Sequence, residues 1–92
     1  MIVRIATESQ YRLPEEDAEA LNELDNHVVA AVEAGDEDRF HEAFEQMIDL
    51  VRRAGTPLGE DELEESDVIL PPPDTSFVEA AAEFTGEGLI PD

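Results

Sequence analysis

The stretch that decides the fold is residues 14–55, which read PEEDAEALNELDNHVVAAVEAGDEDRFHEAFEQMIDLVRRAG. Apolar residues in its first half recur at intervals of three and four, the period of one helix face. They are Leu21, Leu24, Val28 and Val32. Pro14 suits the beginning of a helix, and Gly35 suits its end. This half therefore predicts an amphipathic helix of about residues 15–34.

The second half of the stretch carries another apolar stripe at helical spacing. Its members are Phe40, Ala43, Phe44, Met47, Ile48 and Val51. Asp36 is a suitable N-cap for this helix, and Arg52 and Arg53 occupy its last turn, where positive charge is favourable. Gly55 follows as a stop signal. Because the connection between the two helices is so short, they must be antiparallel neighbours, and the stretch predicts a helical hairpin.

The residues before this stretch predict a β-hairpin. Residues 1–5 (MIVRI) are mostly apolar and rich in β-branched side chains, and residues 10–13 (QYRL) alternate between polar and apolar. Residues 7–9 (TES) form the turn between them, although they contain no glycine. A two-stranded hairpin is only marginally stable in water, so we expect it to pack on the helical hairpin.

The chain after Gly55 predicts a loop, a short strand and one more helix. Residues 56–59 open the loop, and residues 68–70 (VIL) form an apolar run typical of an edge strand. The three prolines at 71–73 prevent this strand from continuing and stiffen the chain into polyproline II. The simpler interpretation of these prolines is a rigid spacer, and the alternative is a segment recognised by an aromatic groove of a partner.

Ser76 and Glu79 form a capping box for a last helix, which we expect to continue to about residue 84. Its apolar face would comprise Phe77, Ala80, Ala81 and Phe84. Gly86 ends it, and a tail of residues 88–92 (GLIPD) follows. The fold class is therefore α+β: an N-terminal β-hairpin packed on a helical hairpin, with a short strand and a C-terminal helix. We expect residues 1–92 to form a single domain.

The composition of the chain excludes several classes of function. It has 25 acidic and 5 basic residues among 92, all the basic ones being arginine, and a net charge of −20. So few cations cannot neutralise a phosphate backbone, which argues against nucleic-acid binding. They also cannot hold the chain on an anionic membrane surface. No apolar run is long enough for direct membrane insertion, and no leader sequence is recognisable, so we expect a cytoplasmic protein. Without cysteine, thiolate chemistry is impossible.

The acidic excess has three interpretations: disorder, mimicry of a nucleic acid, and adaptation to a salt-rich cytoplasm. The apolar residues make up 41% of the chain and follow helical and strand periods, which argues against disorder. Molar salt screens the mutual repulsion of carboxylates, which also keep a protein soluble. Arginine without lysine, beside abundant alanine and valine, favours a halophilic source.

Both histidines have a carboxylate four residues away, which is the spacing for contact on one helix face. Glu23 precedes His27, and Glu45 follows His41. A metal pair or a general base is conceivable, but in so acidic a chain almost any histidine has such a neighbour. We therefore interpret both as histidines at the boundary of the core. No metal-ligand spacing is recognisable, and no metal or other cofactor is expected.

The acidic run of residues 60–67 lacks the alternating ligands, the central glycine and the terminal glutamate of a calcium loop. We expect it to bind hydrated cations loosely. No phosphate-binding loop, nucleophile motif or defined acid–base pair occurs in the chain. We therefore expect no enzymatic activity. The arginines, among them Arg4 and Arg12 on facing strands, are most simply explained by pairing with nearby acids.

Read in order, these segments resemble the PspA-associated protein family (PspAA). The segments that carry the resemblance are MIVRI (1–5), QYRL (10–13), LNELD (21–25), AAVEAGD (30–36), GTPL (55–58), DEL (61–63), SDVILPPPD (66–74) and EGLIP (87–91). Each is weak alone, but the ordered set spans nearly the whole chain. The resemblance implies an accessory role beside PspA, a helical protein of the ESCRT-III-like class that assembles on stressed membranes. It carries over no catalytic residue.

The resulting hypothesis is a small adaptor that binds a PspA-like helical partner through an apolar surface and modulates its assembly. Tyr11, Leu70, Leu89 and Ile90 are the candidate contact residues, because the proline segment and the tail carry apolar groups poorly suited to a closed core. Any recruitment to the membrane would come from the partner. The alternative is an acidic nucleic-acid mimic or a regulator that binds a basic partner. Self-association into a homo-oligomer is left open.

Overall fold

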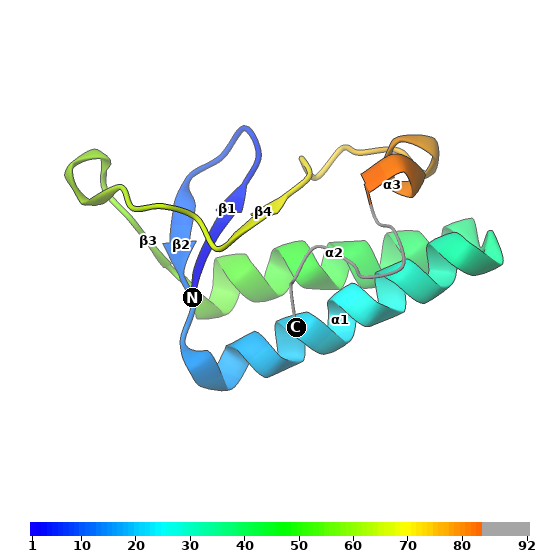
Figure 1. Cartoon of the computed structure of the whole chain (residues 1–92), viewed down its shortest axis with the longest axis horizontal. Helices are drawn as coiled ribbons and strands as arrows, with labels where there is room; N and C mark the ends of the chain where they lie inside the picture. The colour runs from blue at the N-terminus through cyan, green and yellow to red at the C-terminus, as the bar shows by residue number, and fades with distance from the viewer. Residues whose placement is uncertain (84–92) are drawn as a thin grey trace.

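The computed structural model describes residues 1–83. Its elements in chain order are β1 (Ile2–Ile5), β2 (Gln10–Arg12), α1 (Glu15–Ala34), α2 (Glu37–Ala54), β3 (Thr56–Pro57), the 3₁₀ turn η1 (Glu60–Glu62), β4 (Val68–Leu70) and α3 (Phe77–Glu83). The predicted α+β fold is confirmed, including the N-terminal hairpin, the two packed helices and the short strand. In Figure 1 the strands lie over one end of the helical hairpin, and α3 lies over the other.

The turn between α1 and α2 is formed as the sequence predicts. Gly35 adopts the left-handed conformation with φ of 70°, and its N–H donates to the carbonyls of Ala31 and Val32. The side chain of Asp36 then caps α2 by accepting a hydrogen bond from the N–H of Arg39 at 3.1 Å. Two local signals therefore reverse the chain within two residues, and α1 and α2 pack side by side.

The buried face of α1 differs from the predicted stripe. Its buried residues are Leu21, Asp25, Val28, Val29 and Ala31. Leu24 and Val32, which the spacing placed on the stripe, are only partly buried. α1 contacts both α2 and α3. On α2 all six predicted residues are buried, together with Leu50.

The four strands form one sheet in the order β3-β2-β1-β4. β1 and β2 are antiparallel, with Val3 opposite Tyr11, and β4 is parallel to β1, with Val3 opposite Val68. β4 is thus an edge strand, as predicted. β3 was assigned to a loop from the sequence, and this assignment is wrong: Pro57 lies opposite Tyr11. A proline is tolerated there because β3 is also an edge.

Successive side chains of a strand point to opposite faces of the sheet, and the register assigns each residue to one of them. The face toward the helices carries Val3, Ile5, Tyr11, Val68 and Leu70, which belong to the core or pack against it. The outer face carries Ile2, Arg4, Gln10, Arg12, Thr56 and Ile69. The hairpin therefore rests on the helices as expected.

The turn between β1 and β2 contains a strained residue. Thr7 has φ of 69°, a left-handed conformation that β-branched residues rarely adopt. The turn is closed by the N–H of Glu8, which donates to the carbonyl of Ile5 at 2.8 Å. Because the turn contains no glycine, a threonine adopts the left-handed conformation that a glycine would adopt without strain.

The predicted capping box of α3 is formed. The hydroxyl of Ser76 accepts from the N–H of Glu79 at 3.2 Å, and the N–H of Ser76 donates to the carboxylate of Glu79 at 3.3 Å. Phe77 meets Phe40 edge-on with ring centroids 5.6 Å apart, and Ala80 is buried. Ala81, which was expected on the apolar face, is exposed. Phe84, Gly86 and the tail of residues 88–92 lie outside the described residues.

Candidate interaction surface

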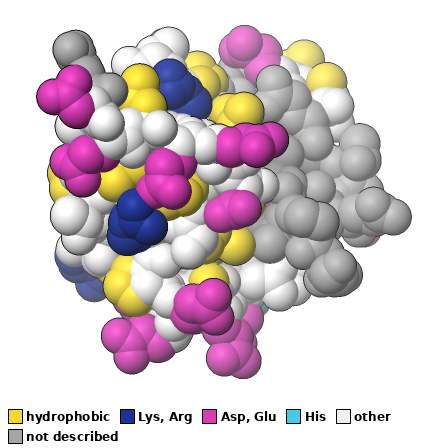
Figure 2. All heavy atoms as spheres, turned by 60° about the vertical axis from the view of Figure 1, so that its left-hand side comes forward, with side chains coloured by type: hydrophobic (Ala, Val, Ile, Leu, Met, Phe, Trp, Pro, Cys, Tyr) yellow, Lys and Arg dark blue, Asp and Glu magenta, His cyan; other side chains and the backbone are white. Residues whose placement is uncertain are grey.

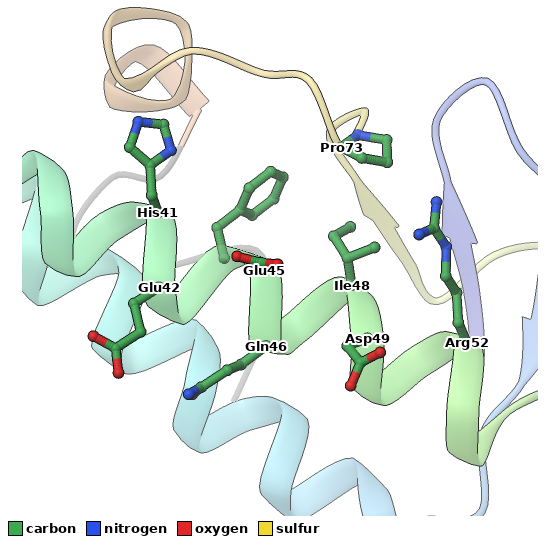
Figure 3. Close-up of a pocket in the computed structure, with 9 residues that line it drawn as sticks. His41, Glu42, Glu45, Gln46, Ile48, Asp49, Arg52 and Pro73 are labelled. Carbon is green, nitrogen blue, oxygen red and sulfur yellow. The ribbon is translucent and has the colours of Figure 1, made fainter.

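A groove of about 720 Å³ lies along α2. It is lined by His41, Glu42, Phe44, Glu45, Gln46, Ile48, Asp49, Arg52 and Pro73. Figure 3 shows His41 at one end of the groove, Arg52 at the other, and Pro73 across from Ile48. One wall is thus a helix, and the other is the segment that follows β4.

The groove combines an apolar floor with an acidic rim. Phe44 and Ile48 are only 3% and 4% exposed and belong to the hydrophobic core, so the floor is fixed by packing. Glu45 and Asp49 are exposed and lie four residues apart, so they lie on one side of α2. An apolar floor next to carboxylates suits a segment that carries both apolar and basic side chains.

An ion pair closes one end of the groove. The guanidinium of Arg52 donates to both carboxylate oxygens of Glu8, one of them at 3.1 Å from Nε. This hydrogen bond raises the pKa of Arg52 above its usual value. The pair ties the β1–β2 turn to the last turn of α2 and keeps Arg52 beside the groove.

The two histidines lie in different places. His27 lines a smaller groove of about 330 Å³ between α1 and α2, together with Glu23. His41 lies 3.8 Å from the carboxylate of Glu37, in the preceding turn, whereas the sequence suggested Glu45. Within the part of the chain that the structure describes, no three histidine or carboxylate side chains are grouped so that they could hold a metal ion.

The four predicted contact residues are not brought together. Tyr11 is half-buried and faces the helices, where its Cβ lies close to Gly55. Leu70 is fully buried in the core, because its side chain lies on the face of β4 that points toward the helices. It therefore offers no surface to a partner. Leu89 and Ile90 lie beyond residue 83.

The exposed large apolar residues among those described are Leu63, Ile69 and Val78, at 59%, 58% and 79% exposure. Sequence reasoning missed Ile69. A signal existed, because in the run 68–70 the middle residue must point away from its neighbours if both of those are buried. The sequence alone does not show whether Val68 and Leu70, or Ile69 instead, face the helices.

Comparison with known proteins identifies the family of this chain. No curated protein and no solved structure matches the chain significantly. No helix among residues 1–83 is long and apolar enough to cross a membrane. The sequence model of the PspA-associated protein family matches residues 1–92. Because this match extends from the first residue to the last, the chain belongs to the PspA-associated protein family.

Proposed function

We propose that this protein is a non-enzymatic accessory protein of a PspA-like membrane-stress system, in which it binds a helical partner and modulates that partner's assembly. Membership of the family supports the accessory role beside PspA. The protein would work in the cytoplasm and reach a membrane only through its partner, because its charge of −20 opposes contact with anionic lipid.

The observation that carries the proposal is the groove along α2. Its wall is an 18-residue helix, about 27 Å long at the rise of an α-helix. Helical segments are commonly bound by placing their apolar face in such a groove. Phe44 and Ile48 would meet the apolar stripe of the partner helix, and Glu45 and Asp49 would pair with basic side chains beside that stripe.

Binding of a partner helix in the groove would change the assembly of the partner directly. Helical subunits assemble by packing apolar stripes against each other, and a stripe held in this groove is withheld from the next subunit. Leu89 and Ile90 are proposed to extend the contact, and Tyr11 to support it from the strand side. Leu70 is left out of the contact set because of its burial.

The test is binding between the full chain and the PspA-like protein of the same organism, measured by calorimetry at the native salt concentration. The double variant Glu45→Lys with Asp49→Lys should weaken binding at least tenfold, since two favourable charge contacts become repulsive. A matched control, Glu19→Lys with Glu33→Lys, makes the same change in charge on exposed positions of α1 and should leave binding within twofold.

The two parts of the proposal fail in different ways. If the unaltered protein neither binds nor co-purifies with the PspA-like protein, the accessory role is wrong. If the wild-type chain binds but the groove variant binds equally well, the role stands and the contact face is wrong. Circular dichroism of each variant shows whether the fold is kept.

The acidic rim also favours a second candidate, a regulator that mimics nucleic acid and binds a basic partner. Glu42, Glu45 and Asp49 follow each other at spacings of three and four along one side of α2. Salt separates the two functions. Binding through carboxylates alone is lost as salt rises, whereas binding that also buries the apolar stripe of a partner helix in the groove persists at molar salt.

A further inference from the structure

The chain between β3 and β4 lies across the outer face of the sheet. In Figure 1 it crosses β2 and β1 on its way to β4. Ile2 and Gln10 belong to that outer face, yet they are only 7% and 4% exposed, because residues 64–67 lie over them. We call residues 59–67 the strap.

Hydrogen bonds fasten the strap to the sheet at two points. At the first, the side-chain amide of Gln10 bonds to the backbone of Glu64 through both its nitrogen and its oxygen, and it also donates to the hydroxyl of Ser66. At the second, the carboxylate of Asp67 accepts from the N–H of Ile2 at 2.7 Å. The N–H of Asp67 in turn donates to the carbonyl of Ile2 at 2.8 Å.

No buried apolar side chain anchors residues 61–67. None of these residues is buried, and Leu63, the one apolar residue among them, is 59% exposed. The flanking Leu58 and Val68 are buried, so the chain is fixed on either side of the strap. A segment that is held by a few hydrogen bonds and buries little apolar surface opens locally, at a lower free energy than that of global unfolding.

The strap also carries a high density of negative charge. Five of residues 61–67 are acidic and none is basic. Figure 2 shows this strand end of the molecule, where magenta acidic side chains stand out from the surface. Within the described chain, Glu64 is the one member of the five that forms an ion pair. Its partner is Arg12, and the two side chains are 48% and 56% exposed.

Repulsion outweighs this single attraction at low salt. An ion pair between exposed side chains contributes at most about 1 kcal/mol. The remaining strap carboxylates have no such pair in the described chain, and the net charge of the whole protein is −20. The strap is therefore pushed away from a molecule of its own sign whenever the repulsion is unscreened.

We infer that the strap is a gate over the outer face of the sheet, which opens without unfolding of the helices and whose opening is controlled by ionic strength. The Debye length falls from about 10 Å at 0.1 M salt to about 3 Å at 1 M. Screening removes repulsion that acts over several residues, whereas the hydrogen bonds of Gln10 and Asp67 act at contact and are weakened less. High salt therefore keeps the strap closed, and low salt opens it.

Opening changes what the outer face offers to another molecule. With the strap closed, Ile69 is the large apolar residue that this face exposes. With the strap open, Ile2 and the side-chain amide of Gln10 join it. The gate is also separate from the proposed groove contact, because the groove is lined by residues of α2 and by Pro73.

The test is amide hydrogen exchange of the isotope-labelled full chain, followed by NMR. The reporter is the N–H of Glu64, which is bonded to Gln10, and the N–H of Val51, a buried residue of α2, serves as the reference. Glu64 should exchange faster than Val51 and should not respond to low concentrations of urea, because local opening exposes little surface. Its protection should rise about fivefold between 0.1 and 1 M KCl.

Matched variants test whether the charge of the strap itself matters. Glu62→Gln with Glu65→Gln removes two strap charges without touching a hydrogen bond of the strap to the sheet, and should raise the protection of the Glu64 amide about threefold in 0.1 M KCl. Glu19→Gln with Glu33→Gln removes two charges from exposed positions of α1. It should leave this protection within about 1.5-fold, since these positions lie outside the strap.

Three results would overturn the inference. Equal free energies of exchange at Glu64 and Val51 would show that the strap opens only when the whole protein unfolds. Protection that stays constant or falls as KCl rises would show that repulsion does not open it. Equal effects of the two pairs of substitutions would show that charge acts on the whole molecule and not on the strap. None of these measurements involves a partner, so the proposed function stands or falls separately.

Discussion

The side-chain amide of Gln10 forms two hydrogen bonds with the backbone of Glu64, 54 residues away in the chain: Nε2 donates to the carbonyl at 2.6 Å, and Oε1 accepts from the N–H at 3.2 Å. Nε2 also donates to the hydroxyl of Ser66 at 2.7 Å. Gln10 is only 4% exposed. One buried amide thus holds the acidic segment of residues 60–67 against the outer face of the sheet, and Arg12 reinforces it by pairing with Glu64.

Replacing Gln10 by leucine should lower the free energy of unfolding by about 1–3 kcal/mol, because the backbone groups of Glu64 lose their partners in a partly buried place. Urea denaturation measures this loss. The control Gln46→Leu alters an exposed glutamine of α2 and should change stability by less than about 0.5 kcal/mol. Equal effects of the two substitutions would show that the Gln10 bonds contribute nothing.

Replacing Gly55 by alanine should destabilise the fold by roughly 1–3 kcal/mol through overpacking. The added Cβ would lie 2.5 Å from the carbonyl oxygen of Val51 and 2.9 Å from Cβ of Tyr11, and neither the helix end nor the strand can yield easily. Gly59→Ala is the matched control, since its Cβ would meet only the flexible carboxylate of Glu62 at 3.3 Å. Thermal unfolding should separate the two variants, and a Gly55→Ala variant as stable as Gly59→Ala would contradict the close approach.

Replacing Thr7 by glycine should stabilise the protein by up to about 1 kcal/mol, because it removes a left-handed strain of about 1–2 kcal/mol and adds a smaller entropic cost to folding. Thr7→Ala keeps a Cβ at φ of 69° and should gain less. The midpoint of urea unfolding decides the order of the three proteins. A loss of stability in Thr7→Gly would mean that the threonine side chain itself holds the turn.

Raising KCl from 0.1 to 1 M should raise the melting temperature by roughly 5 °C, equivalent to about 1 kcal/mol for a domain of this size. The Debye length falls from about 10 to about 3 Å over this range, so the repulsion within a chain of charge −20 is largely screened. Sodium and potassium chloride should act alike at equal ionic strength. A melting temperature that stays constant or falls would contradict the interpretation of the acids as an adaptation to salt.

The helical hairpin could be predicted from the sequence because every signal for it is local. Gly35 and Asp36 adopt the conformations that their residue types favour, and the apolar spacing of α2 marks its buried face. The capping box between Ser76 and Glu79 is equally local, with its two members three residues apart. Such signals act within one helical turn, so tertiary contacts had little to alter.

The candidate surfaces depended on contacts between distant parts of the chain. The groove exists because the segment that follows β4 lies across α2, which no local pattern indicates. Asp25 is buried in the tertiary structure, although its residue type favours exposure. The family resemblance, in turn, was readable from the ordered segments and was confirmed over residues 1–92.

By itself, then, the sequence determined which elements form and where the helices end, since helix periodicity and capping are decided within a few residues. Only the tertiary structure decided the parallel pairing of β4 with β1 across some 65 residues of chain. That pairing sets which side of β4 is buried, because a shift of one residue exchanges the two faces of a strand. It therefore placed Leu70 in the core and left Ile69 on the surface beside Arg4.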